Sequence, residues 1–303
     1  MINNRSEFFS SRPIASAFIV SKHFTFINIA VSAIVFTTKT KGFFLNFAVM
    51  PFELIPFVAQ QFSALIWKLE TDTENDLLYV ETRNQQEHTV AFSAFDLKNE
   101  KANFIELETE EKWLTGMSGG RKQILFLHGY KSAQSPEHKS IIALDGLTGK
   151  QLWADYNLSV EAFTKDGLLA ADQRFQSKRL VLLDYQNGTM KTGTNQMVLP
   201  DVPQEITWPE MLRLPPKNLF NIISATITGE ISCLKYNSYL IISLHTLNKG
   251  NLMQELYVIE NEKLVYRDLL NENIQKLQPE AFVLTKNHLV YIKNKTALKV
   301  LNL

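Results

Sequence analysis

The stretch IIALDGLTGKQLWADYNL, residues 141–158, joins two apolar runs through a turn rich in Asp, Gly and Thr. Asp145 ends the first run, Gly149 lies in the turn, and Trp153 lies in the second run. An Asp side chain accepts hydrogen bonds from the backbone of such a turn, and glycine adopts the positive φ that the turn requires. A tryptophan on a strand can pack between neighbouring sheets. The stretch therefore predicts two antiparallel strands and a side chain that reaches an adjacent sheet.

The chain repeats this kind of strand at intervals. From residue 62 onward, apolar or alternating runs of five to eight residues are separated by clusters of Asn, Asp, Gly and Lys, which is the pattern of strands and turns. The strand that ends at Asp145 has counterparts that end at Asp96, Asp184, Glu260 and about Leu301. Successive ends are 49, 39, 76 and 41 residues apart.

Units of this length predict an all-β protein of the β-propeller class. Four antiparallel strands in roughly 40 to 45 residues form one propeller blade, and so thin a sheet buries its two faces only against other blades. The sequence predicts about six four-stranded blades, with five as the alternative, because the interval of 76 residues holds either one degraded unit or a long insertion.

The propeller is predicted to span residues 50–303. Five of the ten prolines lie between residues 200 and 216, which predicts an insertion at about 197–218 because prolines interrupt a strand ladder. The last unit stops after its third strand, so we expect an N-terminal strand to complete it and close the ring. Residues 64–71, which contain Trp67, are expected to form that outer strand. The alternative is that they form the inner strand of the first blade.

The turn and its tryptophan carry a resemblance to a known family. The pattern Ala143, Asp145, Gly149, Lys150 and Trp153 is similar to the tryptophan-docking repeat of the quinoprotein alcohol dehydrogenase-like β-propellers. Two partial copies keep fewer of its positions, namely Ala94, Asp96 and Lys101 in the first and Asp184 and Gly188 in the second. The resemblance implies a propeller fold and a place in a bacterial family of unknown function.

The same resemblance does not imply a quinone cofactor. The quinone-dependent members of the family that this chain resembles are eight-bladed propellers of about twice its length, with adjacent cysteines and a calcium site. This chain has one cysteine, Cys233, and room for about six blades, so no cofactor is predicted. A lone cysteine also excludes an intramolecular disulfide and a cysteine-based zinc site.

The glycine-rich stretch GMSGGRK, residues 116–122, lacks P-loop spacing and is expected to be the turn of an inner hairpin.

Residues 1–49 differ in composition from the remainder. Residues 1–50 hold five basic residues, one acid and nine of the 20 phenylalanines, whereas the 31 basic and 31 acidic residues of the whole chain cancel. Three interpretations remain open: a signal or membrane anchor, a translation start at Met50, or an atypical ordered extension. A start at Met50 predicts a cytoplasmic protein, and the first interpretation predicts an exported or anchored one.

The balanced charge of the whole chain disfavours nucleic acid as a partner, and residues 50–303 are not expected to insert stably into a membrane.

Polar residues recur where the second strand of each unit leaves the core. Because side chains alternate along a strand, the fifth residue of that strand and the residue two places later share a face, and equivalent positions gather at one end of a propeller. These candidate channel-face binding residues are Glu81, Arg83, His128, Tyr130, Asp172, Arg174, Ser243 and Lys293.

These residues predict a non-catalytic binding or interaction scaffold for a small polar ligand or for a protein or peptide. No catalytic signature identifies a nucleophile or base, so the catalytic residues are unknown. The histidines show no metal-ligand spacing, and no metal is predicted. The alternative is a metal-assisted hydrolase or lactonase in which His128 and Asp172 hold a recruited ion at the central channel.

Overall fold

The computed structural model describes residues 53–177, 179–191, 205–213, 226–278 and 281–303, and every regular element in these ranges is a strand. The all-β prediction is therefore confirmed. The described strands form five antiparallel sheets. This number agrees with the alternative prediction of five blades and not with the preferred prediction of about six. Residues 1–49 and most of the predicted insertion lie outside the described residues.

Two blades have the four-stranded form that the repeat length predicts, and a third has three strands. Each follows chain order, because hairpin turns join successive strands. Blade 1 contains β2 (Leu65–Asp72), β3 (Leu77–Asn84), β4 (Thr89–Asp96) and β5 (Lys101–Glu108). Blade 2 contains β6 (Thr115–Arg121), β7 (Ile124–Ser132), β8 (Ser135–Asp145) and β9 (Gln151–Asp155). Blade 3 contains β10 (Leu158–Phe163), β11 (Leu168–Asp172) and β12 (Arg179–Leu183).

The other two blades each have a fifth strand. Blade 4 contains β14 (Glu210–Leu212), β15 (Ile227–Tyr236), β16 (Tyr239–Asn248), β17 (Asn251–Glu260) and β18 (Lys263–Asn271), in that order. Blade 5 has the order β1 (Val58–Gln61), β21 (Ala297–Asn302), β20 (His288–Lys293), β19 (Phe282–Thr285) and β13 (Ile206–Thr207). The insertion was expected to carry no ladder, but β13 and β14 form short ladders on either side of Pro209.

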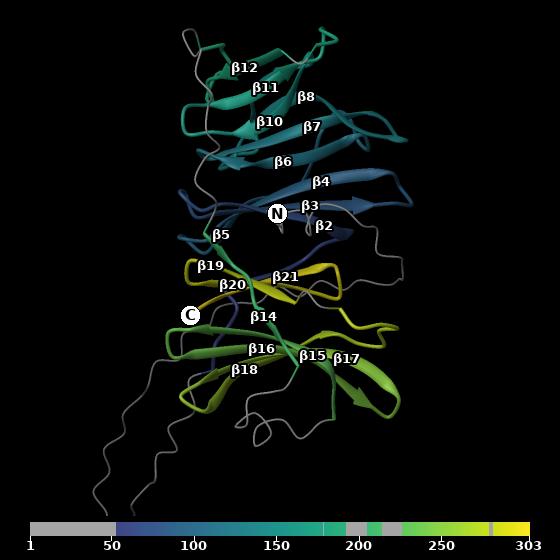
Figure 1. The fold of residues 1–303 in the computed structure, drawn as a ribbon, viewed down its shortest axis with the longest axis vertical. Coiled ribbons are helices and arrows are strands. Elements are labelled where there is room, and N and C mark those ends of the chain that lie inside the picture. Colours follow the sequence, from purple (N-terminus) through teal and green to yellow (C-terminus); the bar gives the residue numbers. More distant parts are fainter. Residues whose placement is uncertain (1–52, 178, 192–204, 214–225, 279–280) are drawn as a thin grey trace, which may run out of the picture.

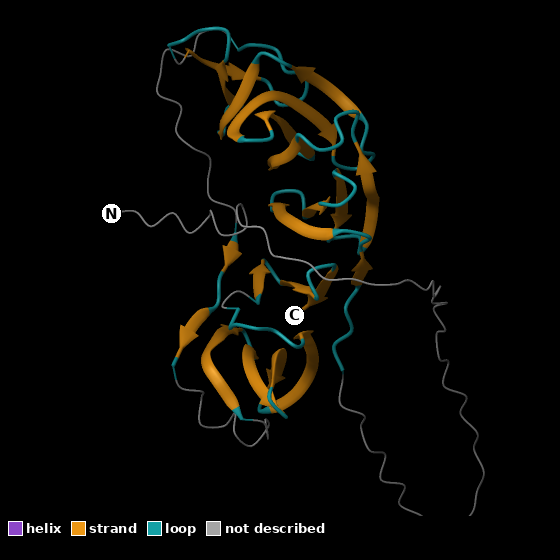
Figure 2. Cartoon of the chain, turned by 90° about the vertical axis from the view of Figure 1, so that its right-hand side faces the viewer, coloured by secondary structure: helices purple, strands orange, loops and turns teal. Residues whose placement is uncertain are grey.

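The blades stack face to face in the order 3, 2, 1, 5, 4 (Figure 1). Each junction is an apolar cluster shared by two blades, such as Tyr79 and Val90 of blade 1 with Leu125 and Leu127 of blade 2. Blades 3 and 4 lie at opposite ends of the stack (Figures 1 and 2). This is the order of neighbours around a propeller ring, in which the last blade lies beside the first.

An N-terminal strand brings blade 5 beside blade 1, as predicted, but it is a different strand from the one expected. β1 pairs with β21 from Val58↔Val300 to Gln61↔Ala297 and is the outer strand of blade 5. Residues 65–72 form β2, which pairs with β3 as the first strand of blade 1, so the expected closing role of residues 64–71 is wrong. β2 and β3 are joined by a tight turn in which Asn75 donates to the Asp72 carboxylate at 2.9 Å, and this local pairing takes precedence over a long-range one.

The glycines of GMSGGRK lie in β6, and the turn follows them at Lys122 and Gln123, where both φ angles are positive. The expectation that the whole stretch is a turn is therefore wrong. A Cβ atom at Gly120 would lie 2.3 Å from the Tyr79 ring of blade 1, and one at Gly119 would lie 2.8 Å from the Phe163 ring of blade 3. These glycines admit aromatic rings from both neighbouring blades.

Candidate functional site

Four of the eight predicted site residues meet at the junction of blades 1 and 2. Glu81 and Arg83 lie on β3, and His128 and Tyr130 lie on the equivalent strand β7. The other four are distributed over blades 3, 4 and 5, where each has its own local environment. The structure therefore brings together half of the predicted set.

A buried ion pair forms the centre of this junction. Arg83 Nε donates to Glu81 Oε1 at 2.6 Å, and the two residues are 8% and 2% exposed. The second carboxylate oxygen, Oε2, accepts from the backbone N–H of Met117 at 2.7 Å. Arg83 Nη2 donates to the carbonyl of Thr115 at 2.6 Å. Because these acceptors and donors lie on β3 and β6, the pair fastens blade 1 to blade 2.

Three aromatic rings surround the Arg83 guanidinium. Its Cζ atom lies 5.5 Å from the ring centroid of Trp67, 5.4 Å from that of Trp113 and 5.8 Å from that of Tyr130. Distances below about 6 Å place a cation within the attractive field of an aromatic face. All three aromatic residues are only partly buried, so the rings also reach the surface.

Two histidines extend the aromatic group. The His128 and His138 rings stack with a centroid distance of 3.5 Å and an interplanar angle of 15°. The Tyr130 and His128 rings pack edge to face, with a centroid distance of 4.8 Å. His128 Nδ1 is hydrogen-bonded to the Ser118 hydroxyl at 2.9 Å. His128 is buried, whereas His138 is exposed at the surface of the group.

Burial fixes the charge state of His128. It lowers the pKa of this imidazole to about 2, and the nearby His138, Lys68 and Arg83 act in the same direction. His128 is therefore neutral, and its buried Nε2 has no hydrogen-bond partner within the described part of the chain. Lys68 adds a fixed cation nearby, since its Nζ donates to the carbonyl of Met117 at 2.9 Å and pairs with Glu70 at 2.9 Å.

We call this group the aromatic cluster; it comprises Trp67, Arg83, Trp113, His128, Tyr130 and His138. The sequence patterns do not indicate Trp67, Trp113 or His138 as site residues. Trp113 lies in the segment before β6 and His138 at an irregular part of β8, so neither follows the strand periodicity on which the prediction depended. No local signal in the sequence identifies them.

The remaining predicted residues lie apart from this junction, in blades 3, 4 and 5. Arg174 donates to both carboxylate oxygens of Asp172, at 2.9 and 2.6 Å, which lowers the pKa of Asp172 to about 2. Lys293 donates to Asp268 at 2.5 Å, and Asp268 also accepts from the Tyr291 hydroxyl at 2.7 Å. The buried hydroxyl of Ser243 has no hydrogen-bond partner among the described residues.

The described residues contain no group of three or more His, Cys, Asp or Glu side chains placed to hold a metal ion. His128 and Asp172, which the hydrolase alternative would pair, are engaged with Ser118 and Arg174 respectively. The aromatic cluster combines partly exposed aromatic residues and the Tyr130 hydroxyl with a buried cation, Arg83, and Lys68 lies beside it.

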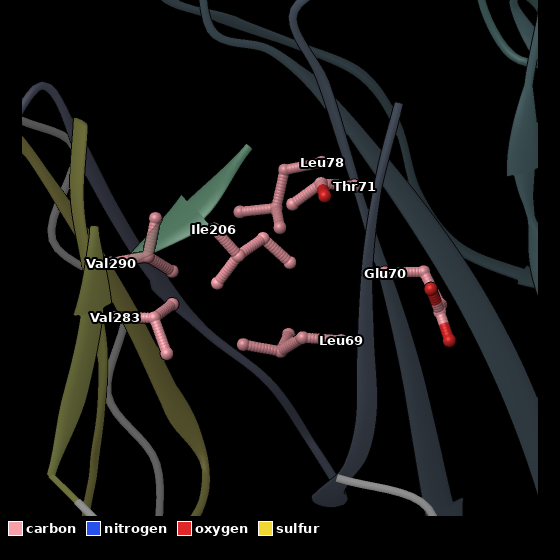
Figure 3. A pocket seen from close by; sticks show the side chains of 7 residues that line it. All are labelled: Leu69, Glu70, Thr71, Leu78, Ile206, Val283 and Val290. Carbon is pink, nitrogen blue, oxygen red and sulfur yellow. The ribbon is translucent and has the colours of Figure 1, made fainter. Parts of the chain in front are cut away.

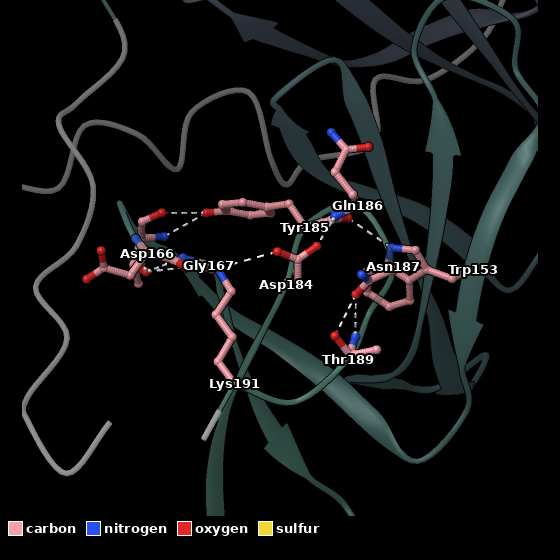
Figure 4. A network of polar contacts seen from close by, with 10 residues as sticks. Trp153, Asp166, Gly167, Asp184, Tyr185, Gln186, Asn187, Thr189 and Lys191 are labelled. Carbon is pink, nitrogen blue, oxygen red and sulfur yellow. Dashed lines mark hydrogen bonds and ion pairs between the residues drawn. The ribbon is translucent and has the colours of Figure 1, made fainter. Parts of the chain in front are cut away.

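The residues of the structural repeat form a chain of contacts between blades 2 and 3 (Figure 4). Asp145 Oδ1 accepts from the backbone N–H groups of Leu147 and Thr148 at 2.8 and 2.7 Å, and Gly149 has a φ of 73°. Trp153 Nε1 donates to the carbonyl of Tyr185 in the corresponding turn of blade 3 at 2.9 Å. Its ring covers Gly188, where a Cβ atom would lie 2.6 Å from Trp153 Cε3.

The partial copy in blade 1 makes the same contact with a different ring. A Cβ atom at Gly149 would lie 3.3 Å from the Phe104 ring, and Phe104 occupies the position that corresponds to Trp153. Glu100, which stands at the place of the turn glycine in this copy, adopts a φ of 55°. The aromatic side chain of one blade thus packs on the turn glycine of the next.

Comparison with known families finds one match. The family described as "Domain of unknown function (DUF4905)" matches residues 71–153, which is 83 of the 303 residues. This part begins near the end of β2, ends at Trp153 in β9, and contains every member of the aromatic cluster except Trp67. No curated protein sequence matches the chain.

Solved structures show only distant likeness. The propeller domain of the trilobed protease from Pyrococcus furiosus is 10% identical with a TM-score of 0.28, and the alignment covers 78% of this chain and 64% of that one. A bifunctional GH43-CE protein from Bacteroides eggerthii is 10% identical with a TM-score of 0.28 and coverages of 82% and 34%. Raptor from Chaetomium thermophilum is 7% identical with a TM-score of 0.24 and coverages of 82% and 28%. This chain spans less than two thirds of the length of each of these proteins.

Within the ranges that the structure describes, no helix has the length and apolar character needed to cross a bilayer.

Proposed function

We propose that this protein is a non-catalytic β-propeller scaffold that binds a small polar molecule at the aromatic cluster. The observation that carries the proposal is the convergence of three partly exposed aromatic rings on one buried guanidinium. Rings that remain partly exposed above a rigid, hydrogen-bonded base form a preorganised binding surface.

The chemistry of the cluster indicates the class of ligand. The faces of Trp67, Trp113 and Tyr130 favour a flat or ring-shaped group, because stacked rings bury apolar area with little loss of side-chain entropy. The Lys68 ammonium, the exposed His138 ring and the Tyr130 hydroxyl favour polar substituents on that group. Arg83 itself is buried and donates to Glu81 and to the backbone carbonyls of Trp113 and Thr115, so we assign it a role in positioning the rings.

The proposal is tested by thermal unfolding against a defined set of monosaccharides, nucleosides and free amino acids. A ligand that binds only the folded protein raises Tm, by mass action. We expect at least one compound to raise the Tm of the wild-type protein, and we expect Trp113→Ala and His138→Ala to abolish that shift. The matched control is Tyr156→Ala, which removes an aromatic ring that is 69% exposed elsewhere on the surface and should leave the shift unchanged.

Two results would contradict the proposal. One is that no compound of the set changes Tm. The other is a shift that persists in both cluster variants, which would place the ligand elsewhere and leave the cluster as a fastening between blades 1 and 2.

We further infer that the chain is related to the quinoprotein alcohol dehydrogenase-like propellers. The contact of Trp153 with Gly188 and its hydrogen bond to the Tyr185 carbonyl support this relationship, because they join one blade to the turn of the next as the repeat requires. The hydrolase alternative has no comparable support among the described residues.

A further inference from the structure

Residues 206–212, which we call the strap, lie along two neighbouring blades. β13 pairs with β19 through Ile206↔Thr285 and Thr207↔Leu284, and so extends the first-strand edge of blade 5. β14 pairs with β15 from Glu210↔Cys233 to Leu212↔Ile231, and so extends the same edge of blade 4. Figure 1 shows β14 crossing the front of the stack, where it lies beside β15. The strap is thus a strand added to the edges of two sheets.

The strap combines anchored apolar side chains with exposed ones. Ile206 points into the space between blades 1 and 5, toward Leu69 and Leu78 on one side and Val283 and Val290 on the other (Figure 3). Trp208 packs against the same apolar cluster. The strap side chains of Thr207, Glu210 and Met211 are exposed. Because these side chains are exposed, we expect the strap to open at a lower free-energy cost than the central strands, whose side chains are mostly buried.

Ile206 leaves part of its site unfilled. A cavity of about 40 Å³ remains beside it, and its lining is almost entirely apolar. Unfilled apolar space forfeits dispersion contacts, so a larger apolar side chain at this position would gain them. The site therefore fits a bulkier residue than the one that the chain supplies.

The edge to which the strap binds is longer than the strap. β15 spans ten residues, Ile227–Tyr236, and β14 pairs with three of them. Among the described residues, β14 is the strand that pairs with this edge of β15. The backbone groups of an open sheet edge accept an added strand from another chain.

We propose that the strap occupies, within its own chain, the binding groove for an extended peptide of a partner protein. The partner peptide pairs with β19 and β15 in place of β13 and β14, and it inserts a side chain larger than isoleucine between blades 1 and 5. The backbone pairing supplies affinity, and the apolar space beside Leu69 and Val283 supplies selectivity.

The test uses the full chain and two fluorescent peptides. One peptide has the sequence of residues 205–213, EITWPEMLR, and the other carries Ile206→Phe. In the protein, Ile206→Asp weakens the strap, because it buries a carboxylate in an apolar site. A strap that occupies the groove about 90% of the time reduces the apparent affinity for a competing peptide about ten-fold. We therefore expect fluorescence anisotropy to show about ten-fold tighter binding to the Ile206→Asp protein than to the wild type, with the Phe peptide binding more tightly than the Ile peptide.

Hydrogen exchange on the wild-type protein provides a second measurement that does not depend on a variant. With the Phe peptide in excess, amides of β15 outside the three paired residues should become protected, and amides of residues 206–212 should exchange faster. The proposal is overturned if the folded Ile206→Asp protein binds neither peptide, or if the peptide changes neither set of amides. A wild-type dimer that Ile206→Asp converts to a monomer would also overturn it, because the groove would then exchange straps between two copies.

Discussion

Replacing Gly188 by alanine tests the packing of Trp153 on the turn of the next blade. Gly188 has a φ of +69°, and a new Cβ would lie 2.6 and 2.7 Å from Cε3 and Cδ2 of the Trp153 ring. The left-handed conformation costs an alanine about 1–2 kcal/mol. Overpacking against a fixed ring adds about 1–3 kcal/mol, while the lower entropy of the unfolded chain returns about 0.4–1 kcal/mol. We expect Gly188→Ala to reduce the free energy of unfolding by about 2–4 kcal/mol.

The chain contains a matched control that separates the two costs. Gly250 also has a positive φ, +86°, but no atom lies within 4 Å of a Cβ built there. Gly250→Ala should therefore show the backbone cost alone, about 1 kcal/mol after the gain from the unfolded state. Gly149→Ala should be intermediate, because its nearest contact at 2.8 Å is Cδ2 of the flexible Leu107 side chain.

The assay is urea denaturation followed by far-ultraviolet circular dichroism. The order of destabilisation should be Gly188→Ala, then Gly149→Ala, then Gly250→Ala. Adding Trp153→Leu to Gly188→Ala should recover the part of the cost due to the ring, as a double-mutant cycle measures. Equal destabilisation of Gly188→Ala and Gly250→Ala, within about 0.5 kcal/mol, would refute the docking of Trp153 on this turn.

Three further predictions concern the junction of blades 1 and 2. Burial holds the pKa of His128 at about 2, below the ordinary value of about 6.5, so the unfolded state binds the extra proton and stability falls as the pH drops below about 6.5. The loss from this group approaches about 1.4 kcal/mol per pH unit, and denaturation midpoints at pH 7.5, 6 and 5 should show a flatter dependence in His128→Gln. Arg83→Met should cost about 3–5 kcal/mol by urea denaturation, since it leaves Glu81 buried and unpaired, and adding Glu81→Gln should recover part of this cost; an unchanged midpoint would exclude the fastening role. Tyr79→Phe should be neutral or stabilising, because the buried hydroxyl has no hydrogen-bond partner among the described residues, and a loss above about 1 kcal/mol would indicate a partner.

The parts of the fold that depend on local chemistry could be predicted from the sequence. The Asp-terminated strands and the turns with Gly149 and Gly188 are local signals, because the hydrogen bonds and φ angles that form them lie within a few residues. The closing strand β1 could not be found in this way. It has four residues, VAQQ, without a regular alternation of polar and apolar side chains, and its register is set by β21 at the other end of the chain.

The aromatic cluster depends on contacts between blades, which no single strand pattern contains. Glu81 and His128 were predicted because each follows the apolar run of the second strand of its unit, and both are present in or beside the cluster. Trp113 was not predicted, because its position depends on the Arg83 guanidinium, which lies 30 residues earlier in the sequence. The prediction that all eight residues meet at one channel depends on strand periodicity, which contains no information on such contacts, and the structure places four of the eight in other blades.

The contacts that join the blades nevertheless connect residues between 32 and 51 positions apart in the sequence. Lys68 reaches the carbonyl of Met117 over 49 residues, Asp72 accepts from the N–H of Gln123 over 51, and Trp153 donates to Tyr185 over 32. The ring of Tyr79 fits against Gly120 over a similar interval. These separations are about one blade length, since stacked repeats place equivalent positions of neighbouring units side by side. A glycine one blade length after an aromatic residue therefore indicates a packing partner as well as a turn, and this criterion would have assigned Gly120 to β6.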